Sequence, residues 1–216
     1  MLTLYEELLM LSIHENKGTF IGSTVERMKP GLAGAILAEL ALMGKIQASN
    51  NRRLQLIDDS PTADEVLNDA LSALKESEKE RKFGYWINTL CQRAEKYLKQ
   101  ITESLIRKGI VTREEERLIW CIPSPIQPEA KASSKYWLNK RLRGIVLAQE
   151  DAQPRDIVLL SLVRACGLLD LIFLSDERKL AGRYINEAIF TQAIKDPVIQ
   201  TVQEIESAIA AMVEED

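Results

Sequence analysis

The longest apolar pattern in the chain lies between Gly31 and Gly44. Ten of these fourteen residues are Ala, Ile, Leu or Met, and Glu39 carries the only charge. Ala and Leu favour helices, and a helix that is apolar around most of its circumference must be buried on several sides. Gly44 suits the left-handed position that ends a helix, and Pro30 suits a first turn. We therefore expect a buried central helix that begins near Pro30 and ends before Gly44.

Two segments with strand character follow helical patterns that end in glycine. Residues 46–57 contain two short apolar runs around Asn50 and Asn51, which is typical of a β-hairpin. Residues 110–122 repeat this arrangement after Gly109, with a charged tip between the two strands. The sequence therefore predicts two hairpins, each directly after a helix.

Amphipathic patterns predict the remaining helices. Residues 62–65 have the spacing of a capping box, and the charged segment 75–82 predicts an exposed linker. Pro154 and Pro197 suit first turns, and Ser175 suits an N-cap. The predicted helices cover residues 4–13, 66–74, 86–90, 93–108, 129–148, 154–173, 175–195 and 197–216. The one over 154–173 is apolar nearly all round, so we expect it at the centre of a bundle.

These elements predict a mainly α protein that forms a single globular helical domain over residues 1–216. It has a buried central helix and two short β-hairpins that follow helices. We divide it into an N-terminal helix–hairpin half, residues 1–127, and a C-terminal helical half, residues 128–216. The composition agrees, since 46% hydrophobic and 28% charged residues are ordinary values for a folded protein.

Composition and chemistry exclude several classes of protein. No run approaches the ~18 apolar residues of a membrane span, and the N-terminus lacks the basic region and cleavage site of a signal peptide. Cys91, Cys121 and Cys166 are widely spaced, which favours buried thiols in a reducing, cytoplasmic compartment. There is no phosphate loop or metal motif, and His14 is the only histidine. We therefore expect no enzyme activity, no metal and no cofactor.

Two stretches stand out from an ordinary fold. Residues 118–122 are five consecutive apolar residues in a hairpin strand, where a half-exposed strand would alternate. Either both faces are buried, as at a subunit interface, or the hairpin meets a membrane, where Trp is enriched. The four hairpin candidates are Leu118, Ile119, Trp120 and Ile122. A basic run without acids follows, which predicts either a face for anionic lipid or an ordinary solvated helix. Its candidates are Lys131, Lys135, Lys140, Arg141 and Arg143.

Several blocks of the chain, in order, resemble the Golgi phosphoprotein 3 family. They are Leu-Thr-Leu-Tyr-Glu-Glu-Leu-Leu at 2–9, Gly-Leu-Ala-Gly at 31–34, Glu-Leu-Ala-Leu at 39–42, Pro-Thr at 61–62, Asp-Ala-Leu at 69–71, Lys-Gly-Ile-Val-Thr at 108–112, and the helix over 159–169. The resemblance implies a mostly helical peripheral membrane protein. Known members bind phosphatidylinositol 4-phosphate in a basic pocket and insert an apolar hairpin into the bilayer. The eukaryotic members link glycosyltransferase tails to the vesicle coat.

The functional residues of the family are not all present in this chain. The family's pocket uses a tryptophan and three arginines, and these positions fall on Thr24, Ala33, Glu95 and Leu98. None of these side chains offers the bidentate donors that a phosphate monoester prefers. Nearby bases are candidates for a rearranged headgroup site: Arg27, Lys29, Arg93, Lys96 and Lys99. The family's basic N-terminal arm is also absent, so we expect a distant member of prokaryotic type.

Three functions follow as hypotheses. The first is a non-enzymatic peripheral membrane adaptor that binds phosphatidylinositol 4-phosphate or another anionic phospholipid through a basic face and the apolar hairpin. The second is a soluble interaction protein that self-associates through the same hairpin. The third is a tandem winged-helix protein that binds DNA. The third fits least, because the helix that ends at Gly44 has almost no side chains that read base edges.

Overall fold

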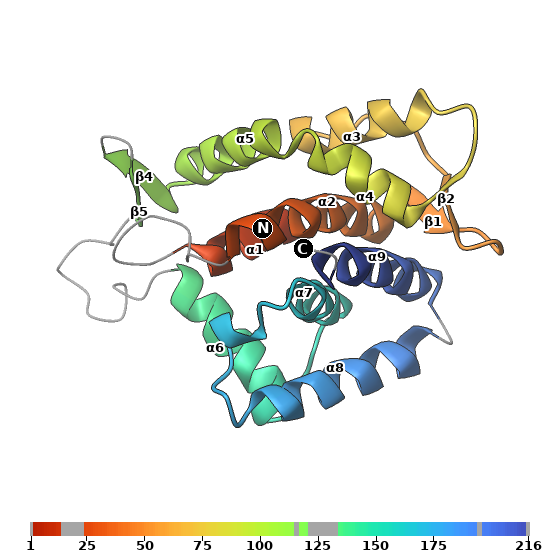
Figure 1. Ribbon diagram of the computed structural model, residues 1–216. Helices are drawn as coiled ribbons and strands as arrows, with labels where there is room; N and C mark the ends of the chain where they lie inside the picture. The colour runs from red at the N-terminus through yellow and green to blue at the C-terminus, as the bar shows by residue number, and fades with distance from the viewer. Residues whose placement is uncertain (1, 14–23, 115–116, 121–133, 194–195, 215–216) are drawn as a thin grey trace.

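Helices dominate the fold, which is a computed structural model describing residues 2–13, 24–114, 117–120, 134–193 and 196–214 (Figure 1). In chain order the elements are α1 (Leu4–Ser12), α2 (Thr24–Leu42), β1 (Ile46–Ala48), β2 (Arg53–Leu56), α3 (Glu65–Lys75), β3 (Arg81–Lys82), α4 (Phe83–Cys91), α5 (Ala94–Arg107), β4 (Val111–Glu114), β5 (Arg117–Trp120), α6 (Ser134–Leu147), α7 (Pro154–Ala165), the 3₁₀ helix η2 (Leu169–Leu171), α8 (Arg178–Ala193) and α9 (Pro197–Glu214). The predicted mainly α fold is confirmed.

Helix α2 is the centre of the fold, as predicted. It packs against α1, α4, α7 and α9, so helices from both ends of the chain share one core. Glycines allow the close approach. A Cβ on Gly31 would lie 2.6 Å from the Cys166 Sγ atom, and one on Gly34 would collide with Ile209 of α9. Helix α7 is also buried around its circumference, which confirms its predicted central position.

The start of α2 differs from the prediction. The helix begins at Thr24, so Pro30 lies inside it and not in its first turn. Tertiary contacts hold the turn before the proline, since Met28 is buried and the Arg27 guanidinium donates to the Gly167 carbonyl at 2.7 Å. These contacts override the usual tendency of proline to break a helix.

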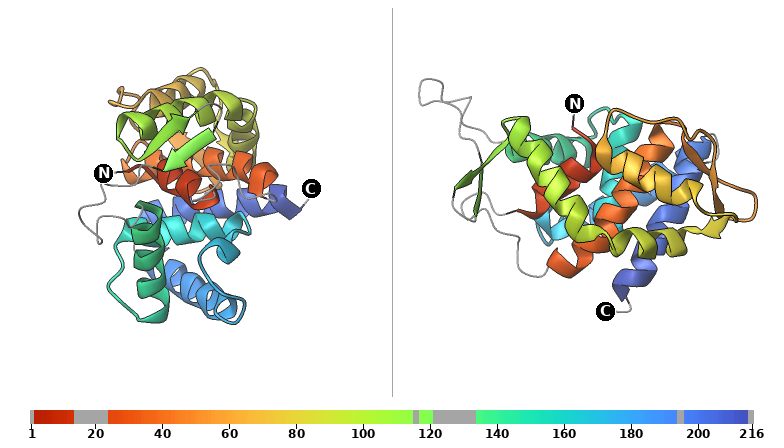
Figure 2. Two further views of the ribbon diagram at one scale, coloured as in Figure 1. Left: turned by 90° about the vertical axis from the view of Figure 1, so that its left-hand side faces the viewer. Right: turned by 90° about the horizontal axis from the view of Figure 1, so that it is seen from above.

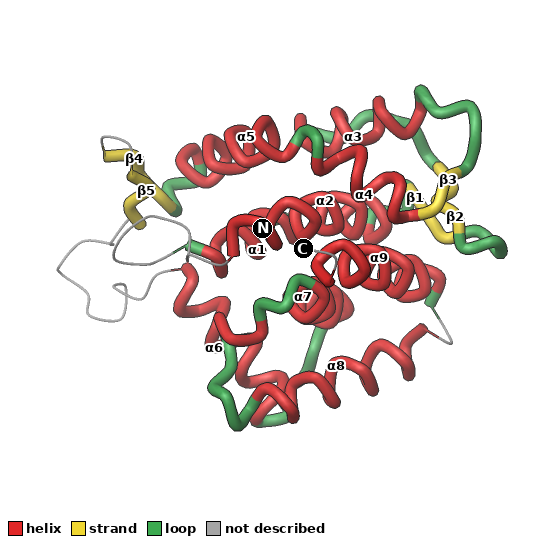
Figure 3. The backbone as a smooth tube through the Cα atoms, viewed as in Figure 1, coloured by secondary structure: helices red, strands yellow, loops and turns green. Residues whose placement is uncertain are grey.

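The first predicted hairpin is part of a three-stranded antiparallel sheet. Strands β1 and β2 pair Ile46 with Leu56, as the hairpin prediction requires. Strand β3 then pairs with β2, bringing Arg81 opposite Leu54. The end of the segment 75–82, which was predicted to be an exposed linker, is exposed but forms strand β3. Figure 3 shows this sheet at one end of the helical body and the β4–β5 hairpin at the other.

Some of the helix ends lie where the sequence predicts them and others do not. Gly44 and Gly109 have φ values of 70° and 68° and end their helices as predicted. Gly167, with φ of 64°, ends α7 before the predicted residue 173. Helix α3 is capped by Asp64, whose carboxylate accepts from two backbone N–H groups, and not by Thr62. Helix α8 begins at Arg178, after the predicted cap at Ser175.

Candidate functional site

The β4–β5 hairpin follows α5, as predicted, and pairs Val111 with Trp120. It projects from one end of the molecule, and the view from above agrees (Figure 2). The side chains of Leu118, Ile119 and Trp120, like Ile122, lie outside what the structure describes. Their predicted role in membrane contact or self-association therefore stays a prediction.

Exposed aromatic side chains gather on α6, which begins at the same end of the molecule (Figure 1). Trp137 is 50% exposed and Tyr136 is 49% exposed, and their rings meet edge to face with centroids 5.4 Å apart. The Lys140 ammonium lies 5.0 Å from the centroid of the Trp137 ring. We call Tyr136, Trp137 and Lys140 the aromatic–lysine cluster.

The basic face predicted around α6 does not form as one surface. Lys135 was predicted on this exposed face, but its side chain is buried, and its ammonium donates to the carbonyls of Leu11 and Ile13. These carbonyls lie at the end of α1, and the lysine satisfies them. Lys131 lies outside the described residues.

The two arginines of that predicted face are paired with acids. Arg141 contacts Glu7 at 2.9 Å and Asp156 at 3.0 Å. Arg143 makes two parallel 2.7 Å contacts with the Glu177 carboxylate. Arg141 therefore joins α6 to α1 and α7, and Arg143 joins α6 to the turn before α8. Lys140 is the described member of the face that stands exposed beside an aromatic ring.

The positions of the family's lipid pocket provide no phosphate cradle. Ala33 is only 1% exposed, Glu95 is exposed and Leu98 is half-buried, while the Thr24 side chain is not described. Lys99 is exposed on α5. The acid at position 95 and the apolar groups at 33 and 98 would not attract a phosphate monoester.

The nearby bases on α5 are held by an acid from α3. Arg93 and Lys96 both contact the Asp69 carboxylate, at 3.0 Å and 2.5 Å, and the Tyr97 hydroxyl donates to it at 2.8 Å. Burial raises the pKa of Asp69, but Lys96, Tyr97 and Arg93 together leave the pKa below its usual value. The carboxylate is thus ionised, and an anionic headgroup would have to compete with it for these bases.

Two bases on α2 lie near the thiols of the partly buried Cys91 and the buried Cys166. Burial raises the pKa of the Cys91 thiol to about 11, with the charge of Lys29 opposing the rise. Burial likewise raises the pKa of Cys166 to about 12, against the charge of Arg27. Both thiols are protonated at neutral pH, so neither is an activated nucleophile.

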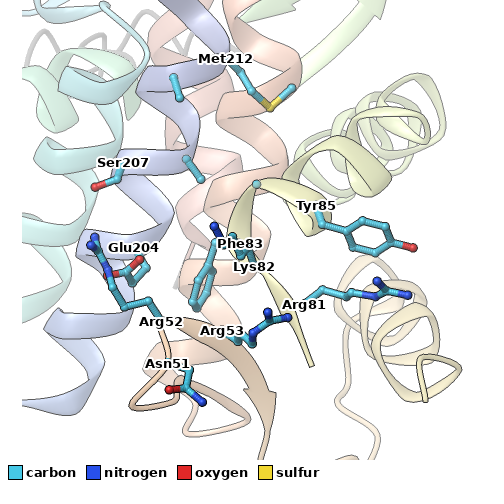
Figure 4. A pocket seen from close by; sticks show the side chains of 13 residues that line it. Asn51, Arg52, Arg53, Arg81, Lys82, Phe83, Tyr85, Glu204, Ser207 and Met212 are labelled. Carbon is cyan, nitrogen blue, oxygen red and sulfur yellow. The ribbon is translucent and has the colours of Figure 1, made fainter. Parts of the chain in front are cut away.

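A groove that the sequence analysis missed lies at the three-stranded sheet (Figure 4). Its volume is about 770 Å³, and β2–β3 pairing brings Arg53 and Lys82 opposite each other along its wall. The same pairing places Arg52 and Arg81 nearby. We call it the basic groove, and its lining residues are Asn51, Arg52, Arg53, Arg81, Lys82, Phe83, Gly84, Tyr85, Glu204, Ser207, Ala208, Ala211 and Met212.

The side chains of the basic groove differ in how they are held. Arg52 pairs with Glu204 of α9 at 2.5 Å, and Arg53 donates to the Glu80 carbonyl at 2.9 Å. The Arg81 guanidinium lies 5.2 Å from the centroid of the exposed Tyr85 ring. Two adjacent basic pairs were the available sequence signal, but nothing local indicated that strands 53–56 and 81–82 would meet.

Within the described residues there is no helix long and apolar enough to span a bilayer, and no group of three His, Cys, Asp or Glu positioned to hold a metal.

Comparisons with known proteins agree with the sequence blocks. The sequence model of Golgi phosphoprotein 3 (GPP34) matches residues 4–205. Vacuolar protein sorting-associated protein 74 from Eremothecium gossypii is 26% identical over 178 residues, which cover 73% of this chain and 51% of that protein. The chain thus spans about half the length of this relative. Because the family match extends over nearly all of its residues, the chain belongs to the Golgi phosphoprotein 3 family.

Proposed function

We propose that this chain is a non-enzymatic peripheral membrane adaptor that binds anionic phospholipid. The contact surface is the end of the molecule that carries the β4–β5 hairpin and the start of α6. Family membership supports the adaptor role, and the name of the relative refers to protein sorting. The observation that carries the lipid proposal is the exposed aromatic–lysine cluster of Tyr136, Trp137 and Lys140.

This cluster has the chemistry of a membrane interface. Trp and Tyr are enriched where an apolar phase meets water, since their rings are amphipathic. A lysine close to an anionic surface adds about 1 kcal/mol of attraction. The chain as a whole has a net charge of −4, so attraction to anionic lipid must come from a local surface and not from overall charge.

The proposed ligand is an anionic lipid surface, without a strict requirement for one headgroup. Ala33 and Glu95 stand where the family's pocket needs arginines, and Asp69 already holds Arg93 and Lys96. A preference for phosphatidylinositol 4-phosphate is therefore a separate proposal, and its candidate donors are the five predicted bases, Arg27, Lys29, Arg93, Lys96 and Lys99. Vesicles that contain this lipid, compared with phosphatidylserine vesicles of equal charge, measure that preference.

Substituting Trp137 with serine is expected to weaken binding to phosphatidylserine vesicles by about tenfold, because an indole leaves the interface. Co-sedimentation at low and high salt measures the effect. Tyr85→Ser is the matched control, since Tyr85 is 50% exposed at the other end of the molecule. The proposal fails if the wild-type protein ignores anionic vesicles at low salt, or if both variants lose binding equally.

A further inference from the structure

We propose that the basic groove is a docking site for an acidic peptide segment of a partner protein. An apolar side chain of the peptide lies on the groove floor, and carboxylates on either side meet the basic rim. The inference goes beyond lipid binding and does not depend on it, because the groove and the hairpin lie at opposite ends of the molecule (Figures 1 and 2).

The charge of the groove selects an acidic partner. Four basic side chains line it, Arg52, Arg53, Arg81 and Lys82, against the single acid Glu204. Glu204 is already paired with Arg52, which leaves the other three bases without an acid among the described residues that line the groove. Arg53 uses one donor on a backbone carbonyl, and the side chains of Arg81 and Lys82 donate to no residue in the part of the chain that the structure describes. An arginine fork binds a carboxylate through two parallel hydrogen bonds.

The rim is partly preorganised. The Arg81 guanidinium stacks over the Tyr85 ring, and β3 is fixed to β2 by strand pairing. A side chain already held in one orientation loses less conformational entropy when a ligand binds. Figure 4 shows Arg53 and Arg81 on the same side of the groove, with Tyr85 above Arg81.

The floor distinguishes a peptide from other anions. Ala208, Ala211 and Met212 of α9 provide the apolar surface of the groove, and Phe83 of α4 also lines it but is only 2% exposed. A free phosphate gains nothing from such a floor. A single-stranded nucleic acid stacks its bases on exposed aromatic faces, but Phe83 is buried and the Arg81 guanidinium lies over one face of the half-exposed Tyr85 ring. An apolar residue flanked by acids uses both parts of the groove, and a volume of about 770 Å³ is within the range of ligand pockets.

The test is a selection from a random displayed peptide library on immobilised wild-type protein. We expect the enriched peptides to share an apolar residue flanked by Asp or Glu. A fluorescein-labelled copy of the most enriched peptide should bind about tenfold or more tightly than a copy with the acids replaced by amides, as measured by fluorescence polarisation. The proposal is overturned if acids are not enriched, or if the two copies bind alike.

A charge-reversal pair places the binding in the groove. Arg53→Glu with Arg81→Glu should abolish peptide binding, and both sites are exposed, so circular dichroism should show an intact fold. The matched control is Lys179→Glu with Arg183→Glu on exposed positions of α8, which changes the net charge equally and should bind normally. Equal binding by both double variants overturns the proposal. The proposal is also overturned if the groove variant, and not the control, loses binding to vesicles or to RNA but still binds the peptide.

The same variants separate this inference from the lipid proposal. The groove variant should still sediment with phosphatidylserine vesicles, and Trp137→Ser should still bind the peptide. If Trp137→Ser loses the peptide and the groove variant does not, the docking site lies elsewhere and the inference is wrong.

Discussion

Substituting Glu39 with leucine lowers the free energy of unfolding by about 3–5 kcal/mol, the usual cost of removing one partner from a buried ion pair. Glu39 is the single charge in the central apolar stretch, and it is nearly buried. Its carboxylate accepts two hydrogen bonds from Arg155 of α7, at 2.9 and 2.8 Å. It also accepts the Leu4 backbone N–H at 2.7 Å, so one group joins α1, α2 and α7.

A double variant tests whether the cost comes from the unpaired charge. Glu39→Leu removes the ion-pair partner of the Arg155 guanidinium at position 39 and leaves the Leu4 N–H without its acceptor. Adding Arg155→Met should restore part of the stability, since an apolar pair can replace a buried ion pair. Urea unfolding measures each variant. Asp59→Ala, which breaks an exposed ion pair with Lys75, should leave the unfolding midpoint unchanged. A midpoint unchanged by Glu39→Leu contradicts the account.

Substituting Lys108 with methionine lowers the free energy of unfolding at neutral pH by about 2–3 kcal/mol. The Lys108 ammonium contacts both oxygens of the Glu6 carboxylate, at 2.6 and 2.7 Å. Glu6 is 1% exposed at its side chain, whereas the lysine reaches water, which reduces the cost below that of a fully buried pair. The contact joins α1 to α5.

The effect of Lys108→Met depends on pH in a defined direction. Burial raises the pKa of Glu6, but Lys108, the Thr3 N–H and Ser104 leave the pKa below its ordinary value of 4.5. In the wild-type protein this contribution is complete above pH 4.5 and is lost as the pH falls through the lowered pKa. In the variant, which lacks the lysine, we expect burial to raise the pKa of Glu6. The variant should therefore regain stability as the pH falls and Glu6 takes a proton. The difference between the two proteins should therefore shrink at acid pH.

Thermal unfolding at neutral pH and at acid pH measures this difference. Burial raises the pKa of Glu7, which contributes with the opposite sign, but Glu7 is the same in both proteins and does not affect the comparison. Lys99→Met is the control, because it removes an exposed lysine from the same helix. A stability loss that is constant with pH would show that Glu6 and Lys108 are not coupled.

Features determined by a few neighbouring residues could be predicted from the sequence. Gly44 and Gly109 end their helices because the left-handed conformation is a property of the residue itself. Asn50 and Asn51 lie in the turn between β1 and β2, as predicted, but the residue with the left-handed conformation there is Arg52, with φ of 57°. The same rule applies to Gly167, but apolar residues on both sides of it obscured the end of α7.

Contacts between distant segments could not be predicted in this way. Strand β3 consists of two charged residues, which have strand structure only because β2 offers an edge. Lys135 belongs to a basic run, yet its ammonium lies beneath the surface at the end of α1. Glu6 and Glu7 lie in the first turn of α1, but their partners come from the end of α5 and from α6. A pattern of charge does not show which charges are already paired.

The candidate site could be predicted only in part. The hairpin after α5 and the basic, aromatic composition of α6 were visible in the sequence, and family blocks indicated the family. Whether Trp137 packs inward or faces solvent depends on which face of α6 packs against the core. That face carries the buried residues Lys135, Leu138 and Leu142, and Trp137 is half exposed. The basic groove depends on β2–β3 pairing and on α9, and no single segment indicates it.

The two ends of the molecule are proposed to make different contacts, the hairpin end with lipid and the sheet end with a peptide. Hydrogen–deuterium exchange with and without phosphatidylserine vesicles tests this most directly. We predict slower exchange on vesicles in the hairpin, residues 111–120, and in the first turn of α6, with no change at residues 49–56 and 81–85. Slower exchange at the three-stranded sheet, with none at the hairpin end, would contradict the account.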